Sequence, residues 1–276
     1  MVKKRILIVT QELKPYVEAT EAANIVRELA GKAVEKGLDI RILMPRFGSI
    51  NERRHRLHEV VRLSGINIII EDDDYPLVIK VASLPGVRMQ VYFLDNEDFF
   101  RREHAYQDEE GVLYDDNAAR MVFFCRGVLE TVKKFGWAPD IIHCHGWMSS
   151  FVPLFLRTAY AKDPIFEHGR ILYSIYKNDF EGALEKNYVD KAAINRVKEE
   201  DVAPYKSANN ADLHIGALHY SDAVILATED IDPAVTEALK EKDIPVLAYP
   251  GEDYLDAYTS FYSQLIEMES ESEDKA

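Results

Sequence analysis

Cysteine, positive charge and long apolar runs are all scarce in this sequence, and each shortage excludes a class of protein. The two cysteines, Cys125 and Cys144, belong to no CxxC pair that would bind metal or exchange thiols, so we expect free thiols in a reducing compartment. Lysine and arginine number 33 against 48 aspartates and glutamates, and the net charge of −15 disfavours nucleic acid and anionic membranes as partners. The apolar run near the start, RILIVT, is too short for a signal peptide or a membrane span, which predicts a cytoplasmic protein.

What is present is the composition of an ordinary globular protein, with 47% hydrophobic and 29% charged residues in a chain of 276. No repeat, glycine-serine linker or change of composition divides the chain. We therefore predict a single domain over residues 1–266. The remaining residues, 267–276, are dominated by carboxylates and predict an acidic flexible tail.

Strand and helix patterns alternate along the chain, as in a Rossmann-like sheet. Residues 4–10 form an apolar run of strand length, residues 21–36 carry apolar side chains at helical spacing, and residues 39–44 predict a second strand. Gly37 is placed to end the helix. This order predicts a right-handed parallel crossover and opens a three-layer α/β domain with a mainly parallel sheet.

The rest of the chain extends this pattern. Three short runs without helices between them, residues 66–70, 77–82 and 90–94, predict a small antiparallel insert. The polar stretch 177–207 predicts exposed helix and loop. Further helices are expected at residues 117–134, 148–160, 213–220, 233–242 and 254–267, and further strands at 141–143, 171–175, 223–227 and 244–247. The last helix is expected to cover one face of the sheet, and Asp232 with Pro233 predicts a helix start.

Ligands of open α/β sheets bind beyond the carboxyl ends of strands, so the loops after Thr10, Met44, His143 and Ile175 are the ones to inspect. The first loop has no glycine, and acidic residues flank the start of its helix. Such side chains satisfy the helix dipole themselves. An ordinary helix capped by Thr20 is therefore favoured over a phosphate cradle.

The segment IIHCHGWMSS places two imidazoles at a strand end, with His143 and His145 on one side and Cys144 on the other. Two histidines supply half of a zinc site, so we expect no metal and favour one buried histidine and one that lines a pocket. Cys144 is interpreted as small apolar filler.

A carboxylate precedes the helix predicted at residues 117–134. Asp116 or Asn117 is placed to cap that helix, and the alternative is that a carboxylate here converges with a histidine on a sugar hydroxyl. The basic stretch RFGSINERRHRLH is interpreted as a solvated loop, with a phosphate-bearing ligand as the alternative.

Several segments, in order, resemble the N-terminal half of bacterial glycogen synthase and plant starch synthase. The segments are RILIVTQELKP, DIRILMPRFG, VYFLDNEDFF, LYDDNAARMVFFCRGVLE, WAPDIIHCHGWMSSFVPLFLR and HYSDAVILATE. The resemblance spans residues 3–240. It implies the N-terminal Rossmann-like half of a two-domain glycosyltransferase that uses ADP-glucose.

The resemblance also implies site residues. His145 matches the family histidine that contacts the transferred glucose, and Asp116 matches an acidic residue of the same site, so these two are the candidate catalytic residues. The candidate substrate-binding residues lie in the matched loops and are Glu12, Tyr16, Glu18, Thr20, His143 and Trp147.

The departures from the family pattern concern the donor. Where the family has Lys-x-Gly-Gly-Leu, this chain has Glu18 at the lysine and Thr20 and Glu21 at the glycines. An anion replaces the cation expected beside the diphosphate, and side chains obstruct the close backbone approach that glycine permits. The basic residues of the family's second domain also lie outside this sequence, so we expect the chain alone to be inactive and to need no cofactor.

Three hypotheses follow. The favoured one is a regulatory module of polysaccharide metabolism that binds α-glucan or a protein partner, in effect a pseudoenzyme. The alternative is half of a split ADP-glucose-dependent α-1,4-glucan glucosyltransferase, completed by a separate C-terminal-type domain. A small-molecule binder unrelated to glucan is the third. An apolar cleft surface left open would be covered by a partner or by self-association into a homo-oligomer.

Overall fold

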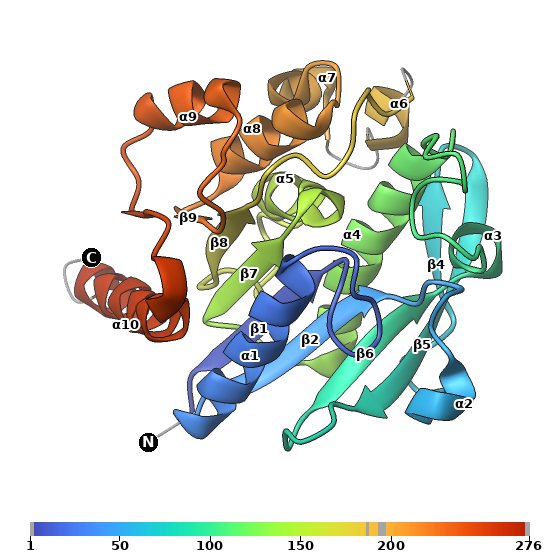
Figure 1. The fold of residues 1–276 in the computed structure, drawn as a ribbon, viewed down its shortest axis with the longest axis horizontal. Coiled ribbons are helices and arrows are strands. Elements are labelled where there is room, and N and C mark those ends of the chain that lie inside the picture. The colour runs from blue at the N-terminus through green and yellow to red at the C-terminus, as the bar shows by residue number, and fades with distance from the viewer. Residues whose placement is uncertain (1–2, 186–187, 193–196, 274–276) are drawn as a thin grey trace.

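The sheet runs through the whole molecule, with helices packed on both of its faces (Figure 1). The structure is a computed structural model that describes residues 3–185, 188–192 and 197–273. Within these residues the strand order is β10-β9-β8-β7-β1-β2-β6-β5-β3, and β4 pairs with β5. The strands are β1 (Arg5–Thr10), β2 (Asp39–Pro45), β3 (His58–Glu59), β4 (Ile66–Ile70), β5 (Asp73–Ser83), β6 (Gln90–Asp95), β7 (Ile141–His145), β8 (Arg170–Ile175), β9 (Ala223–Leu226) and β10 (Val246–Leu247).

The first crossover has the predicted form. Strand β1 is central, parallel to β2 on one side and β7 on the other, which is why its run of apolar residues is buried on both faces. Helix α1 (Ala22–Glu35) buries the predicted stripe that includes Ile25 and Leu29. Gly37 follows its end at φ +84°, and its N–H donates to the Val34 carbonyl.

The antiparallel region is confirmed, but one of its strands belongs to the core. Strand β5 is antiparallel to both β4 and β6, as the short spacings predicted. Strand β6, however, is also parallel to β2, with Phe93 opposite Met44. The run at residues 90–94 therefore continues the main sheet, and β5, β4 and β3 extend it.

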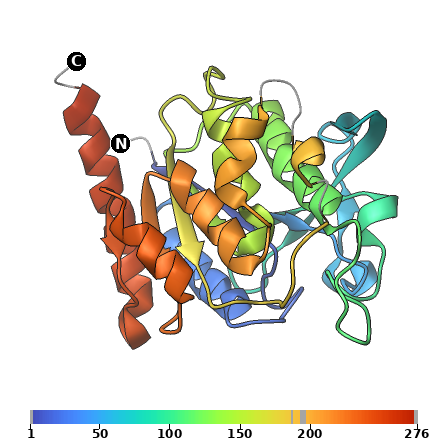
Figure 2. The same ribbon diagram turned by 90° about the horizontal axis from the view of Figure 1, so that it is seen from above.

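Two helical layers sandwich the sheet, as Figure 2 shows from above. Helices α4 (Asn117–Phe135), α5 (Phe151–Arg157) and α8 (Asn210–Tyr220) pack together on one face. Helices α1 and α10 (Tyr254–Glu273) pack together on the other. The last helix therefore covers the sheet as predicted. Successive side chains of a strand point to opposite faces of the sheet. Tyr173 of β8 points to one face and contacts His214 of α8, whereas His143 of β7 points to the other and contacts Tyr262 of α10.

The segment predicted to be exposed helix and loop is tied to the core. It contains α6 (Tyr188–Ala192), α7 (Glu199–Val202) and η2 (Ala203–Tyr205). Tyr205 is fully buried, donates to the Ser150 carbonyl at 2.8 Å and packs edge-on against Phe151. The prediction of exposure was therefore wrong for this part, because its few large apolar side chains are enough to anchor it. Residues 186–187 and 193–196 lie outside the described residues.

Smaller differences concern element ends. The helix predicted at residues 148–160 is η1 (Trp147–Ser149) followed by α5, and α10 continues into the first seven residues of the predicted tail. Residues 274–276 of that tail are outside the described part. The short helices that remain are α2 (Glu52–His55), α3 (Glu97–Phe100), α9 (Pro233–Lys240) and η3 (Gly251–Asp253). Asp232 caps α9 by accepting from the Ala234 N–H, as predicted. No helix among the described residues is both long and apolar enough to span a bilayer.

Candidate functional site

Strands β1, β7 and β8 are parallel neighbours, so the loops that follow them meet at one edge of the sheet. These are the loops that the sequence marked for inspection, apart from the one after β2. Their residues divide into three groups: the β1–α1 loop, the two histidines of β7, and a cavity beside the β8 loop.

In the β1–α1 loop, the buried Glu12 carboxylate occupies the backbone N–H groups ahead of α1. Its Oε2 accepts from the N–H of Thr20 at 2.7 Å and of Ala19 at 3.1 Å, and its Oε1 accepts from the Thr20 hydroxyl at 2.9 Å. Such N–H groups are the ones that hold phosphate in nucleotide-binding loops. Here the chain fills that position with its own anion.

Thr20 does not cap α1 in the predicted way. The helix begins at Ala22, its N-cap residue is Glu21, and the Glu21 side chain accepts no capping hydrogen bond. Instead the Thr20 hydroxyl accepts from the Ala22 N–H at 3.2 Å while it donates to Glu12. Thr20 therefore joins the helix start to the Glu12 carboxylate.

Two more candidates in this loop point away from it. Glu18 is exposed and pairs with Lys14 at 3.5 Å. Tyr16 is buried, packs edge-on against Phe93 and donates to the Ser83 carbonyl at 3.0 Å, and burial raises its pKa to about 12. Tyr16 anchors the loop to the sheet, and no described contact links it to Glu12.

The two histidines of β7 are fully buried and lie against each other, with ring centroids 3.8 Å apart and ring planes tilted by 39°. Both nitrogens of His143 are hydrogen-bonded, Nδ1 to the Tyr262 hydroxyl at 2.6 Å and Nε2 to the Ser174 hydroxyl at 2.7 Å. His145 Nδ1 is 2.8 Å from the Tyr176 hydroxyl, and its Nε2 has no partner among the described residues. Burial lowers the pKa of His143 well below its usual value and that of His145 to about 3, so both rings are neutral at pH 7.

The remaining candidates lie apart from this pair. Asp116 precedes α4 and forms a double hydrogen bond with the Arg102 guanidinium, both contacts at 2.6 Å, and its side chain does not cap the helix. No described contact joins it to His145. Trp147 is fully buried against Phe180, with ring centroids 5.0 Å apart. Cys144 is also buried, and burial raises the pKa of its thiol well above the usual value, which suits a core residue.

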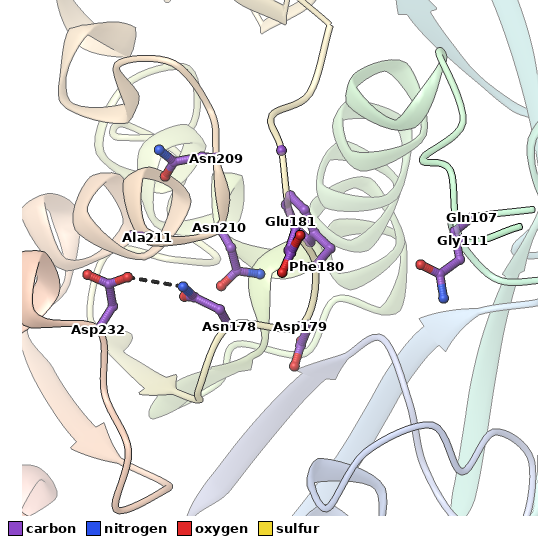
Figure 3. A pocket seen from close by; sticks show the side chains of 11 residues that line it. Gln107, Gly111, Asn178, Asp179, Phe180, Glu181, Asn209, Asn210, Ala211 and Asp232 are labelled. Carbon is purple, nitrogen blue, oxygen red and sulfur yellow. Dashed lines mark hydrogen bonds between the residues drawn. The ribbon is translucent and has the colours of Figure 1, made fainter.

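A cavity of about 700 Å³ opens beside the β8 loop (Figure 3). Its wall combines the segment after β8, the start of α8, the residue before α9 and the loop ahead of α4. Its amide side chains belong to Gln107, Asn178, Asn209 and Asn210, and its carboxylates to Asp179, Glu181 and Asp232. Phe180 contributes an aromatic ring. None of the described lining residues is lysine, arginine or histidine.

Asp179 connects this cavity to the Glu12 loop. Gln11 donates to its Oδ2 at 3.3 Å. Burial, reinforced by the nearby Glu12 carboxylate, raises the pKa of Asp179 to about 7. A carboxyl group that is half protonated at neutral pH is uncommon and marks functional positions more often than others.

Sequence reasoning did not single out Asp179 or Asn210. Asn210 is 2% exposed, yet neither atom of its amide has a hydrogen-bond partner among the described residues. Buried amides in proteins are nearly always paired. The sequence indicated only the loop after Ile175, because ligands of open α/β sheets bind beyond the carboxyl ends of strands, and this indicated no particular residue.

Comparison with known proteins gives the family. The family described as the starch synthase catalytic domain matches residues 5–233. The chain belongs to this family. A glycogen synthase of Chlorobium limicola is 35% identical over 217 residues, which are 78% of this chain and 44% of the relative. One of Chlorobium phaeobacteroides is 34% identical over 235 residues, 82% of this chain and 48% of the relative. The chain therefore spans about half the length of the curated relatives it matches.

A solved structure confirms the fold of this starch synthase family domain. The catalytic domain of starch synthase IV from Arabidopsis thaliana, bound to ADP and acarbose, superposes with a TM-score of 0.74 at 18% identity. The match covers 90% of this chain and 51% of that one. The predicted Rossmann-like α/β fold is thus confirmed, as is the predicted family.

Proposed function

We propose that this domain is a non-catalytic glucan-binding module of polysaccharide metabolism, which holds a glucose residue in the cavity beside Asp179. The observation that carries the proposal is the Glu12 carboxylate on the N–H groups of Ala19 and Thr20. The relatives are glycogen synthases. If the resemblance in sequence extends to the donor site, the donor diphosphate would lie near this loop. A diphosphate would have to displace an internal anion that already has three hydrogen bonds.

The charge of the loop opposes a diphosphate further. Two like charges 5 Å apart repel by about 3 kcal/mol at an effective dielectric constant near 20. Glu12 and Glu21 both flank the start of α1, and neither forms an ion pair among the described residues. A transferase must also stabilise its leaving diphosphate with preorganised positive groups.

The cavity suits a sugar better than a nucleotide. Amide groups donate and accept, and carboxylates accept, which matches hydroxyl groups that do both. Phe180 adds an apolar contact to the cavity wall, while most of its ring is buried against Trp147. The unpaired Asn210 amide supplies one donor and one acceptor in the interior.

Affinity electrophoresis in gels that contain glycogen tests the glucan arm. The wild-type chain is expected to be retarded, and Asn210→Ala is expected to lose most of this retardation. The Asn210 side chain makes no internal hydrogen bond, so its removal breaks none. The melting temperature of the Asn210→Ala variant should therefore stay near that of the wild type. Asn67→Ala, on an exposed strand position away from the cavity, is the matched control. Equal mobility with and without glycogen contradicts the proposal.

Calorimetry with ADP-glucose tests the non-catalytic arm. No heat of binding is expected at millimolar nucleotide sugar. Incorporation of glucose into glycogen, by the chain alone or mixed with a separate C-terminal-type domain, would instead establish the split glucosyltransferase.

A further inference from the structure

The cavity beside Asp179 contains more negative charge than a neutral sugar requires. Asp232 is already engaged, because it accepts from the Asn178 amide at 3.0 Å and caps α9 (Figure 3). Asp179 is different: among the described residues its carboxyl group accepts only from Gln11, at a long 3.3 Å. Glu181 is exposed at the cavity rim. One partly buried carboxyl group therefore faces the cavity without a cation.

Asn210 provides independent evidence that a ligand belongs there. Its side chain is nine-tenths buried or more, and both amide atoms are unpaired. In Figure 3 it extends into the cavity between Asn178 and Phe180. A buried unpaired amide costs free energy that a bound polar ligand would recover.

We propose that the cavity selects a hexose bearing a primary ammonium group, with Asp179 as the counter-ion and Asn210 as the hydrogen-bonding partner of a neighbouring hydroxyl. This inference rests on the proposal that the cavity holds a hexose, and it adds the charge of the preferred ligand. A neutral hexose leaves Asp179 without a cation, and a phosphorylated one brings a like charge.

The groups that act on Asp179 favour a cation. Glu12 and Glu21, from the β1–α1 loop, add negative potential, and Lys177, on its own loop, is the one described basic group that acts on it. Three tyrosines also interact electrostatically with Asp179, namely Tyr106, Tyr173 and Tyr176. Their pKa values are raised, chiefly by burial, so their hydroxyl groups stay neutral. The carboxylates of Glu12 and Glu21 outweigh the one exposed lysine, so the electrostatic potential at Asp179 is negative and favours a cation.

The preference has a defined pH dependence. The pKa of Asp179 is raised to about 7, so the carboxyl group is mostly neutral near pH 6 and mostly ionised near pH 8. An alkylammonium stays charged across this range, as lysine does. Its advantage over a neutral hexose must therefore grow as the pH rises through 7, and near pH 6 its binding must release a proton from Asp179.

Calorimetry of the full chain with 6-amino-6-deoxy-D-glucose and with D-glucose tests this. Near pH 8 the amino sugar is expected to bind about tenfold more tightly than glucose, the least that a charge-assisted hydrogen bond supplies. The ratio should shrink near pH 6, where titrations in two buffers of different ionisation enthalpy should report proton release. Asp179→Asn should bring the ratio to about one at both pH values, while Glu35→Gln, exposed on α1 and absent from the cavity wall, should keep it near the wild-type value.

Other results overturn the inference. A ratio of one in the wild-type chain near pH 8, an advantage that survives Asp179→Asn, or no binding of the amino sugar at all would each do so. Retardation by glycogen that persists in any of these cases leaves the glucan-binding proposal standing, so the two proposals fail separately.

Discussion

Replacing Asp179 by asparagine should stabilise the domain above about pH 4, by an amount that grows up to about pH 7 and then stays constant. The folded chain holds the Asp179 proton up to about pH 7, whereas in the unfolded chain the carboxyl group has its ordinary pKa of 3.8. Between these values the folded state binds more protons, so the free energy of unfolding falls as the pH rises. Below the lower value both states are protonated and the effect vanishes.

The size of the effect follows from the shift. A shift of roughly 3 pKa units, at 1.36 kcal/mol per unit, sets a ceiling of about 4 kcal/mol above pH 7. Asp179 is only partly buried, and water reaches its cavity, so we expect about 2 kcal/mol. Asparagine has the same shape and carries no charge, so Asp179→Asn removes this penalty without leaving a void.

Urea unfolding at about pH 4, 6 and 8 measures the difference between variant and wild type. The expected gain is near zero at about pH 4 and grows toward about 2 kcal/mol at pH 8. Glu181→Gln is the control, since its side chain is exposed and makes no hydrogen bond or ion pair among the described residues, so this variant should differ little from wild type in stability. A gain from Asp179→Asn that does not change with pH would refute the argument that burial and Glu12 hold the proton on this residue.

Two further predictions concern buried hydrogen bonds. Glu12→Ala should lower the free energy of unfolding in urea by about 3 kcal/mol, because two N–H groups and the Thr20 hydroxyl lose their acceptor. Glu18→Ala, the control, should change it by less than about 0.5 kcal/mol. Equal effects of the two variants would contradict the interpretation of Glu12 as an internal anion. Tyr262→Phe should lower the free energy of unfolding by about 1 to 2 kcal/mol, because it leaves a buried nitrogen of His143 unpaired. Tyr254→Phe on the same helix should lower it by less. If Tyr262→Phe did not change the stability, the hydroxyl would not be holding α10 on the sheet.

The parts of the fold that the sequence predicts correctly are those specified by short-range patterns. Residues 4–10 and 21–36 show strand and helix periodicity within single windows, and Gly37 and Asp232 occupy positions that only local backbone geometry determines. The family can be predicted for the same reason, since the resemblance lies in several local segments in a fixed order, and the family model matches residues 5–233.

The errors concern long-range pairing. That β6 lies parallel to β2 depends on a partner some fifty residues earlier in the chain, and the short spacing to β5 suggested a separate hairpin. Tyr205 looked exposed because its neighbours are polar, yet its contact with Phe151 is made across the fold. His145 and Asp116 do not converge on one site: His145 is hydrogen-bonded to Tyr176, and Asp116 to Arg102.

The cavity residues could not be predicted at all, for a related reason. Asp179 and Asn210 sit in polar sequence, where an acid or an amide attracts no attention. Their significance depends on the β8 loop lying beside the start of α8, and on the Glu12 loop lying close enough to act on Asp179. Neither adjacency is written in a local pattern.

One side chain links the two halves of the proposed function. Glu12 occupies the N–H groups ahead of α1, and its charge also helps to hold the proton on Asp179. In the two proposals the same carboxylate opposes a diphosphate at the first loop and adds negative potential to the neighbouring cavity. If Glu12 were neutral, the first loop would lose its internal anion and Asp179 would ionise at lower pH, so the two properties must change together. Under the two proposals, weaker binding of a diphosphate and stronger binding of a cation would thus both follow from a single buried group.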